Sequence, residues 1–278
     1  MSTVLARKIA LFVDFRAQPP YLEAMPGALP QRLGAALAGL LLLGASGPGA
    51  PDVRGAVNAF VTRVAAADIR DLVIDQILDV YDAQGRHRQT RVDQRLFIKM
   101  PDLQRLEQTV EGVREIQIVA GDRAWSRRAE GKIGEMSLDR RRDTARLLLP
   151  LKRSGDELLA DWRTLGVRDD VAHVATVTHR RITVIGASPG DRDSPSVWLD
   201  PQYGVVRLIT RQKLPDGPAL LDLSLSEYHA LIGGVFFPYR QEAFVNGKLL
   251  LLITVRSVSV NTGLRGELFD PDALRRGR

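Results

Sequence analysis

The chain has 278 residues, of which 45% are hydrophobic and 26% are charged, and its formal net charge is +6. This composition is that of a globular chain and excludes an intrinsically disordered one. The absence of cysteine excludes disulfides, thiolate metal sites, a cysteine nucleophile and a lipid-anchored N-terminal cysteine.

The first recognisable segment is an uncharged stretch of 13 residues, LGAALAGLLLLGA, at positions 33–45. It is shorter than the roughly 20 residues that a membrane-spanning helix needs. Arg32 precedes it and small residues follow it, which is the order found in a secretory signal peptide. We therefore predict a signal peptide at residues 25–50 and export of the mature chain, with a buried core helix as the alternative.

Met25 offers an alternative start, because a signal peptide that begins there has an ordinary secretory length. Residues 1–24 would then be a start-site artefact or an extension. The expected organisation is thus this extension, the signal peptide, and one folded domain over residues 51–278.

The folded domain is expected to open with an amphipathic helix over residues 55–67, since its apolar side chains share one helical face. Residues 67–82 fit either a helical stripe or an alternating strand. Their β-branched content and the turn residues that follow favour a strand that enters a hairpin. Further strands are expected at 86–99, 104–119 and 123–128, which indicates an antiparallel sheet.

A break in the strand pattern follows, where residues 137–166 predict two helical pieces separated by Pro150. The second piece begins at Ser154 with Glu157 three residues later, which is the spacing of a capping box, and Gly166 ends it.

The C-terminal half returns to short strands with well-marked turns. The expected strands cover residues 173–186, 195–200, 205–213, 219–228, 234–245 and 248–260. Asn246-Gly247 between two apolar runs is the strongest hairpin signal in the chain. The fold class expected is therefore α+β, mainly β, with a single curved antiparallel sheet.

Residues 249–255, LLLLITV, are apolar at positions that would face both sides of the sheet. An antiparallel strand with one solvated face does not have this pattern. We expect apolar cover on each side, supplied either by helices and a second sheet or by a ligand on one face.

The sequence offers one match to a catalytic motif, G-x-S-x-G at residues 186–190, followed by Asp200 or Asp222 and by His229. Pro189 follows the serine and has no N–H group for an oxyanion hole, so we interpret the segment as a loop. The four histidines lack metal-ligand spacing and there is no phosphate-binding loop. We therefore expect no catalytic residue, no metal and no cofactor.

Arginine supplies most of the positive charge and is densest in two clusters. These are Arg123, Arg127 and Arg128, and Arg140, Arg141, Arg142 and Arg146. We interpret both as solvated faces, with contact to an anionic membrane surface as the alternative. Aromatic residues are only 6% of the chain and are not interleaved with the arginines, so we do not expect a nucleic-acid partner.

The order of these elements resembles the LolA/LolB-like family of periplasmic lipoprotein carriers, also described as outer-membrane lipoprotein-sorting proteins. The resemblance spans about residues 55–270. The pieces that carry it are the opening helix, Asp75-Gln76, the Gly85 hairpin, the Leu96–Pro101 strand end, Gly121-Asp122-x-x-Trp125, Trp198-Leu199-Asp200, Gly233 through Pro238, Asn246-Gly247, Asn261 and Phe269.

This resemblance implies an incomplete antiparallel barrel with helices packed over its concave face, in which an apolar groove holds acyl chains in the periplasm. It implies a carrier that is a monomer and not an enzyme, with an inner-membrane donor complex and an outer-membrane acceptor as partners. We take six residues as candidates for the apolar lining: Ile98, Met100, Leu106, Ile116, Ile118 and Trp125.

One residue departs from the family pattern. The lipoprotein carriers resemble one another in having arginine directly before the proline at this strand end, whereas this chain has Met100 before Pro101. Methionine cannot hold lid carbonyls as arginine would. This leaves open a different lipid cargo, or a sensor or protein-interaction role in the envelope like that of the related sigma-factor regulatory domains.

Overall fold

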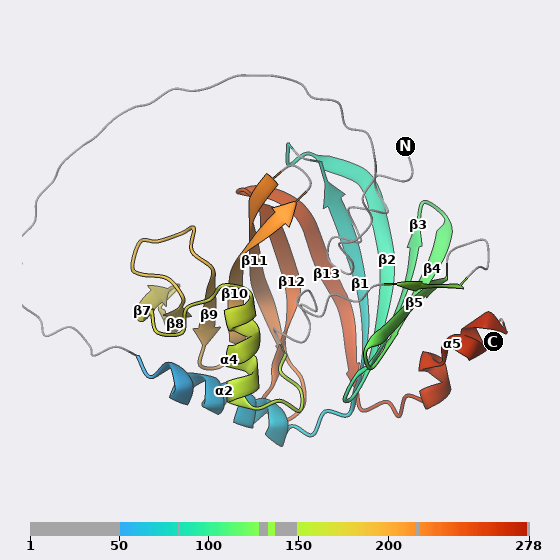
Figure 1. Ribbon diagram of the computed structural model, residues 1–278, viewed down its shortest axis with the longest axis horizontal. Helices are drawn as coiled ribbons and strands as arrows, with labels where there is room; N and C mark the ends of the chain where they lie inside the picture. The colour runs from blue at the N-terminus through green and yellow to red at the C-terminus, as the bar shows by residue number, and fades with distance from the viewer. Residues whose placement is uncertain (1–50, 83, 128–132, 137–148, 215–216, 277–278) are drawn as a thin grey trace, which may run out of the picture.

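A computed structural model describes residues 51–82, 84–127, 133–136, 149–214 and 217–276. These residues form one antiparallel sheet of 13 strands in the spatial order β6-β5-β4-β3-β2-β1-β13-β12-β11-β10-β9-β8-β7. The sheet is strongly curved and is not closed, since its end strands β6 and β7 each have a single neighbour (Figure 1). The expected α+β class with one curved antiparallel sheet is therefore confirmed.

Consecutive strands are neighbours within two runs, β1 to β6 and β7 to β13, and the two runs join where β1 pairs with β13. The segment between β6 and β7, the two edge strands, contains helix α4 (Gly155–Thr164). The bounds of the strands are β1 Asp71–Tyr81, β2 His87–Lys99, β3 Leu103–Val110, β4 Val113–Ala120, β5 Arg123–Arg127, β6 Ile133–Met136, β7 Ala172–Val177, β8 Arg180–Ile185, β9 Ser196–Asp200, β10 Gly204–Leu214, β11 Gly217–Ala230, β12 Phe236–Val245 and β13 Lys248–Val260. The ambiguous segment 67–82 thus contains a strand, β1. The Asn246-Gly247 hairpin joins β12 to β13 with positive φ at both residues.

Two segments expected as single strands are hairpins instead. Residues 104–119 turn at Glu111-Gly112, and residues 173–186 turn at Thr178-His179; all four residues have positive φ. Two consecutive residues in this conformation make a tight turn whose twist matches that of the flanking strands. Because the turns carry Glu, Thr and His beside a single glycine, their sequence signal is weak.

Two helices lie side by side at one end of the sheet, beside β8, β9 and β10 (Figure 1). Helix α2 covers Val53–Ala66, and its N-cap Asp52 accepts a hydrogen bond from the N–H of Gly55 at 2.8 Å. Helix α4 covers Gly155–Thr164 and begins with the expected capping box between Ser154 and Glu157. Of the other expected helical piece, residues 137–148 lie outside the described residues.

The C-terminal tail, for which no element was predicted, forms a 3₁₀-helix, η2 (Gly266–Phe269), and a short helix, α5 (Pro271–Arg275). It packs at the opposite end of the sheet from α2 and α4, beside β3 and β4 (Figure 1). Within the described ranges, no helix is both long and apolar enough to span a membrane.

Candidate functional site

The sheet has two chemically different faces. We call the face that packs with α2 and α4 the inner face, and the opposite one the outer face. Residues directly opposite each other in neighbouring strands share a face, so the strand pairing assigns the side chains. The inner face carries Leu72, Ile74, Gln76, Leu78 and Val80 of β1, Val92, Gln94, Leu96 and Ile98 of β2, Leu221, Leu223 and Leu225 of β11, and Leu251, Ile253 and Val255 of β13.

Close glycine contacts hold the two helices against each other and against the sheet. A Cβ at Gly204, the first residue of β10, would lie 2.4 Å from Cε2 of Phe60 of α2. A Cβ at Gly155 would lie 2.0 Å from Oδ1 of Asn58. These distances leave no room for a side chain at either position, so both glycines permit the close approach of α2.

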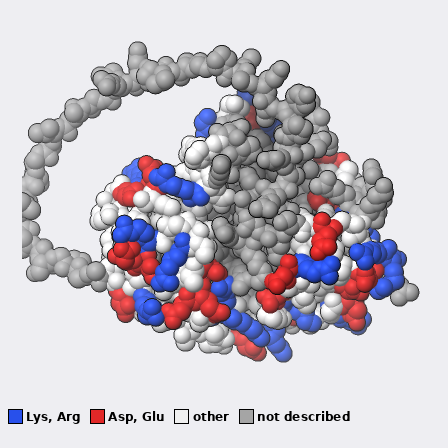
Figure 2. All heavy atoms as spheres, viewed as in Figure 1, with Lys and Arg blue, Asp and Glu red and all other residues white. Residues whose placement is uncertain are grey.

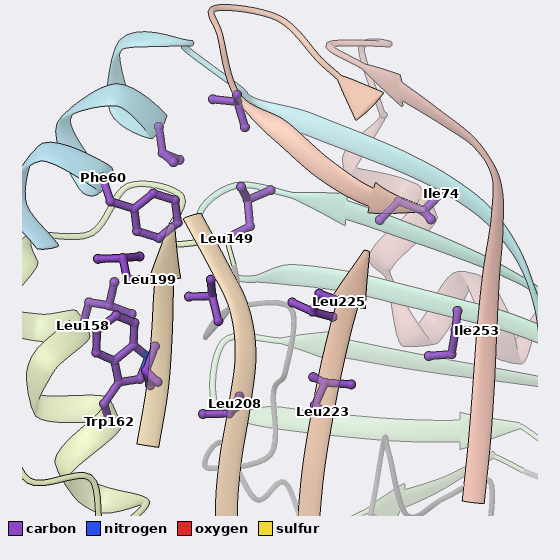
Figure 3. Packing of buried hydrophobic residues seen from close by; sticks show 14 of the residues in the cluster. Phe60, Ile74, Leu149, Leu158, Trp162, Leu199, Leu208, Leu223, Leu225 and Ile253 are labelled. Atoms are coloured by element: carbon purple, nitrogen blue, oxygen red, sulfur yellow. The ribbon is translucent and has the colours of Figure 1, made fainter. Parts of the chain in front are cut away.

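The helices cover only part of the inner face. In Figure 3 Phe60, Leu158 and Trp162 gather against Leu199 and Leu208. Further round the curved sheet, Leu223 and Leu225 of β11, Ile253 of β13 and Ile74 of β1 project from the strands on the same inner side (Figure 3). All belong to one cluster of buried apolar side chains, so the inner face forms a continuous apolar surface that extends from the helices across the sheet.

A row of polar side chains crosses this apolar surface. Gln76, Gln94, Gln108 and Glu115 lie directly opposite one another on β1, β2, β3 and β4. Each glutamine donates its side-chain N–H to the next residue, at 2.5, 3.0 and 3.0 Å. The three glutamines are buried. Because each amide is hydrogen-bonded, the row removes most of the cost of burying polar groups beside Leu72, Ile74 and Leu78.

Sequence reasoning did not identify this row. Each glutamine occupies an alternating position in its own strand, but the row depends on the register of four strands, and neither register nor the turn at Glu111-Gly112 was predicted.

The structure does not bring the six predicted lining residues onto one surface. Ile98 and Leu106 lie on the inner face, and Met100, just after β2, packs against the same cluster as Ile98. Ile116, Ile118 and Trp125 lie on the outer face, where they pack with Phe269 and Leu274 of the C-terminal tail. A ligand on the inner face would therefore not contact these last three residues.

The tail is also fixed to the outer face by hydrogen bonds to its backbone carbonyls. Arg105 of β3 donates to Leu268 O at 2.9 Å, Arg127 of β5 donates to Leu274 O at 2.9 Å, and Lys99 donates to Leu264 O at 2.6 Å. The outer face of this half of the sheet is consequently covered by the chain's own C-terminus.

The expectation of apolar cover on both sides of residues 249–255 is only partly met. Leu251, Ile253 and Val255 are buried on the inner face, but Leu250 and Leu252 are only half-buried. Leu252 lies on the outer face between the acidic residues Asp79 and Glu242 of the neighbouring strands. Its apolar side chain therefore remains partly in water.

Charged groups gather on the outer face and the rim, where they are largely paired. Arg95 pairs with Asp75 at 3.2 Å, and Arg207 pairs with Asp222 at 2.6 Å. Figure 2 shows acidic and basic side chains interleaved over the described part of one face, rather than gathered by sign. An exposed pair such as Arg95–Asp75 adds little stability, and side chains of mixed sign form no strong one-sign field.

The predicted arginine clusters are only partly described. Arg123 pairs with Glu135 at 3.0 Å and lies 4.9 Å from the ring centre of Trp125. Arg127 donates its hydrogen bond to the carbonyl oxygen of Leu274 in the C-terminal tail. Arg128, Arg140, Arg141, Arg142 and Arg146 lie outside the described residues.

The motif at residues 186–190 does not assemble a catalytic triad from its candidate partners. Ser188 is exposed in a loop, and Asp200 accepts two hydrogen bonds from Arg180, at 2.6 and 2.7 Å. Asp222 is paired with Arg207, and the ring of His229 stacks on Tyr239 at 3.9 Å. Each candidate acid is thus engaged by an arginine.

No protein-family model matches the chain, and no curated protein matches it in sequence. Solved structures match over most of its length. A domain named for outer-membrane lipoprotein sorting, from Vibrio parahaemolyticus, has 12% identity and a TM-score of 0.52, and the match covers 81% of this chain and all of that one. A DUF1329 family protein from Desulfovibrio piger has 11% identity and a TM-score of 0.50, covering 80% and 98%.

A LolA superfamily protein from Nitrosomonas europaea is similar at 9% identity and a TM-score of 0.49, with coverage of 78% and 98%. At such identities the first two likenesses establish the fold alone. The chain has a LolA-like fold: an open, curved antiparallel sheet with helices at its inner face.

Proposed function

We propose that this protein is an exported, non-enzymatic carrier that binds acyl chains of a lipid or lipoprotein on the inner face of its sheet. The observation that supports the proposal most is the inner face itself, where apolar side chains from β1, β2, β11 and β13 continue the surface that α2 and α4 begin. The fold, which is shared with a domain named for lipoprotein sorting, agrees with this function.

The physics of binding requires no catalytic residue. Burying an acyl chain contributes about 0.8 kcal/mol per methylene, so a chain of roughly 16 carbons would contribute on the order of 10 kcal/mol before ordering costs. Release into water would be slow for the same reason. Unloading therefore requires a second apolar surface that accepts the chain, which on this proposal belongs to an outer-membrane acceptor, while an inner-membrane complex loads a monomeric carrier in the periplasm.

A pair of matched substitutions tests the proposal. Leu225→Gln places an amide on the inner face, whereas Leu252→Gln makes the same change on the outer face. Binding of a fluorescent fatty acid should weaken about tenfold in Leu225→Gln and stay unchanged in Leu252→Gln. Thermal unfolding of both variants controls for loss of the fold. Failure of the wild-type protein to bind any acyl probe would refute the carrier function.

A second candidate is a sensor or protein-interaction module in the envelope, built on the same fold. Met100 favours it, because this side chain packs against the apolar cluster and supplies no charged group at the position where the lipoprotein carriers have arginine. A defined complex with one envelope protein, with both proteins free of lipid by mass spectrometry, would support this candidate over the carrier.

A further inference from the structure

Arg153 directly precedes Ser154, the N-cap of α4, and lies in the chain between two residues that pack on the inner-face cluster. Leu151 packs against that cluster and Leu158 belongs to it. The side chain of Arg153 is only 9% exposed. A cation is therefore buried at the start of the helix that packs on the inner-face cluster.

The guanidinium of Arg153 uses only one of its three nitrogens. Nη2 contacts the Asp161 carboxylate at 2.8 Å and donates to the carbonyl oxygen of Glu157 at 3.3 Å. Nε and Nη1 are buried and have no hydrogen-bond partner among the residues that the structure describes. Since an arginine has five N–H groups, three of them are removed from water without compensation. Buried donors of a charged group are costly to leave in this state.

A second buried arginine, Arg105, has partners for the nitrogens that Arg153 leaves unpaired. Arg105 is 10% exposed, and its Nε and Nη1 contact Glu107 at 2.7 Å and Leu268 O at 2.9 Å. Within the described residues, Arg153 is the arginine whose buried nitrogens lack partners. The local fold thus buries the Arg153 cation without completing its hydrogen bonds.

Among the described residues, three acidic groups close to Arg153 in the chain are already engaged. Asp161 is paired with Arg153 itself and is about one-third exposed, and Asp156 pairs with Arg54 at 2.7 Å. Glu157 accepts hydrogen bonds from the N–H and the hydroxyl of Ser154, at 2.7 and 2.9 Å. The Asp161 pair holds the guanidinium in place, while its unpartnered N–H groups remain available to a second anion.

We propose that the unpartnered N–H groups of Arg153 bind the anionic group, a carboxylate or a phosphate, of an amphiphile whose acyl chain lies on the inner face. This inference rests on the proposed function and names its ligand class: anionic lipids, in preference to neutral ones. A neutral headgroup would leave the Nε and Nη1 donors of Arg153 incompletely hydrogen-bonded. The protein should therefore bind an anionic lipid more tightly than a neutral lipid with the same acyl chain.

The test compares a fluorescent long-chain fatty acid with the alcohol of the same chain at pH 8, where the acid is ionised. The wild-type protein should bind the acid about tenfold more tightly than the alcohol. Arg153→Gln should reduce acid binding to the level of the alcohol and leave the alcohol unchanged, and Arg153→Lys should restore part of the difference. Arg168→Gln, at an exposed arginine paired with Asp170, is the matched control and should change neither.

The outcomes separate this inference from the function on which it rests. Equal binding of acid and alcohol by the wild-type protein, or an equal loss of both in Arg153→Gln, would overturn the Arg153 site and leave the carrier intact. Binding of neither probe would overturn the carrier. Stabilisation of the wild-type protein, but not of Arg153→Gln, by inorganic phosphate alone would identify a free anion as the ligand and contradict the lipid headgroup.

Discussion

The carboxylate of Asp71, at the start of β1, accepts hydrogen bonds from the backbone N–H and the hydroxyl of Thr262, at 2.6 and 2.8 Å. It also accepts from the N–H groups of Gly263 and Leu264, at 3.0 and 3.3 Å. Asp71 is buried, and the three donating residues lie in the segment that leads from β13 to η2 of the C-terminal tail. One carboxylate therefore fixes where the tail leaves the sheet.

Replacing Asp71 by asparagine should destabilise the protein by about 1.5–3 kcal/mol, because charge-assisted hydrogen bonds are lost and backbone donors are left without an acceptor. Urea denaturation measures the change. Asp75→Asn on the same strand is the control: Asp75 is part-exposed and paired with Arg95, so its loss should cost no more than about 0.5 kcal/mol. Equal effects of the two substitutions would contradict the anchoring role of Asp71.

The same carboxylate should make stability fall in acid. Burial raises the pKa of Asp71, but the hydrogen bonds from Thr262, Gly263 and Leu264 outweigh burial and hold the pKa below its ordinary value. A carboxyl whose pKa is lower in the folded state adds stability above its unfolded pKa of about 3.9 and loses it as the pH falls through the folded value. The stability difference between wild type and Asp71→Asn should therefore shrink between pH 6 and pH 3. A difference that is constant over this range would be contrary to the expected titration.

The glutamine row should behave as a coupled unit. Gln94→Leu removes the acceptor of Gln76 and the donor to Gln108, both buried, and should cost about 1–3 kcal/mol. Replacing Gln76 as well should cost less than the sum of the two single changes, because the pair then leaves fewer unpartnered groups. A double-mutant cycle by chemical denaturation measures this coupling, and simple additivity would argue against a hydrogen-bonded row.

Gly204→Ala should disturb the seating of α2. The new Cβ would meet the ring of Phe60 and would also occupy a residue with φ of +84°, so we expect a loss of about 2–4 kcal/mol. Gly121→Ala is the matched control, since Gly121 has φ of +59° and no atom within 4 Å of the added Cβ; its cost should be about 1–2 kcal/mol. Thermal or urea denaturation of both variants measures the two losses of stability. The difference between them is the cost of the clash with Phe60, because both variants pay the cost of an alanine at positive φ.

Much of the sheet could be predicted from local patterns. The turn residues around Asp200–Gly204 and Asn246-Gly247 place the C-terminal strands closely, and the Ser154–Glu157 capping box locates the start of α4. These features are encoded by residues near in sequence, where turn and cap chemistry is specific.

The faces of the strands could not be predicted, and one missed turn explains why. If residues 104–119 formed one strand, Leu106, Ile116 and Ile118 would share a face because their positions differ by even numbers. The turn at Glu111-Gly112 instead places Leu106 opposite Gln117, so Ile116 and Ile118 lie on the outer face. The tail that covers them begins after β13, and its packing partner on β4 is more than 140 positions earlier in the chain, a contact that no local pattern reveals.

The central claim is that the inner face holds an acyl chain. Native mass spectrometry of the protein expressed with its own N-terminal segment, recovered from the cell envelope without detergent, tests it most directly. The account predicts an added mass that corresponds to an acyl-bearing molecule and that is depleted in Leu225→Gln but retained in Leu252→Gln. A bare protein mass in every preparation, together with no binding of a fluorescent fatty acid, would contradict it.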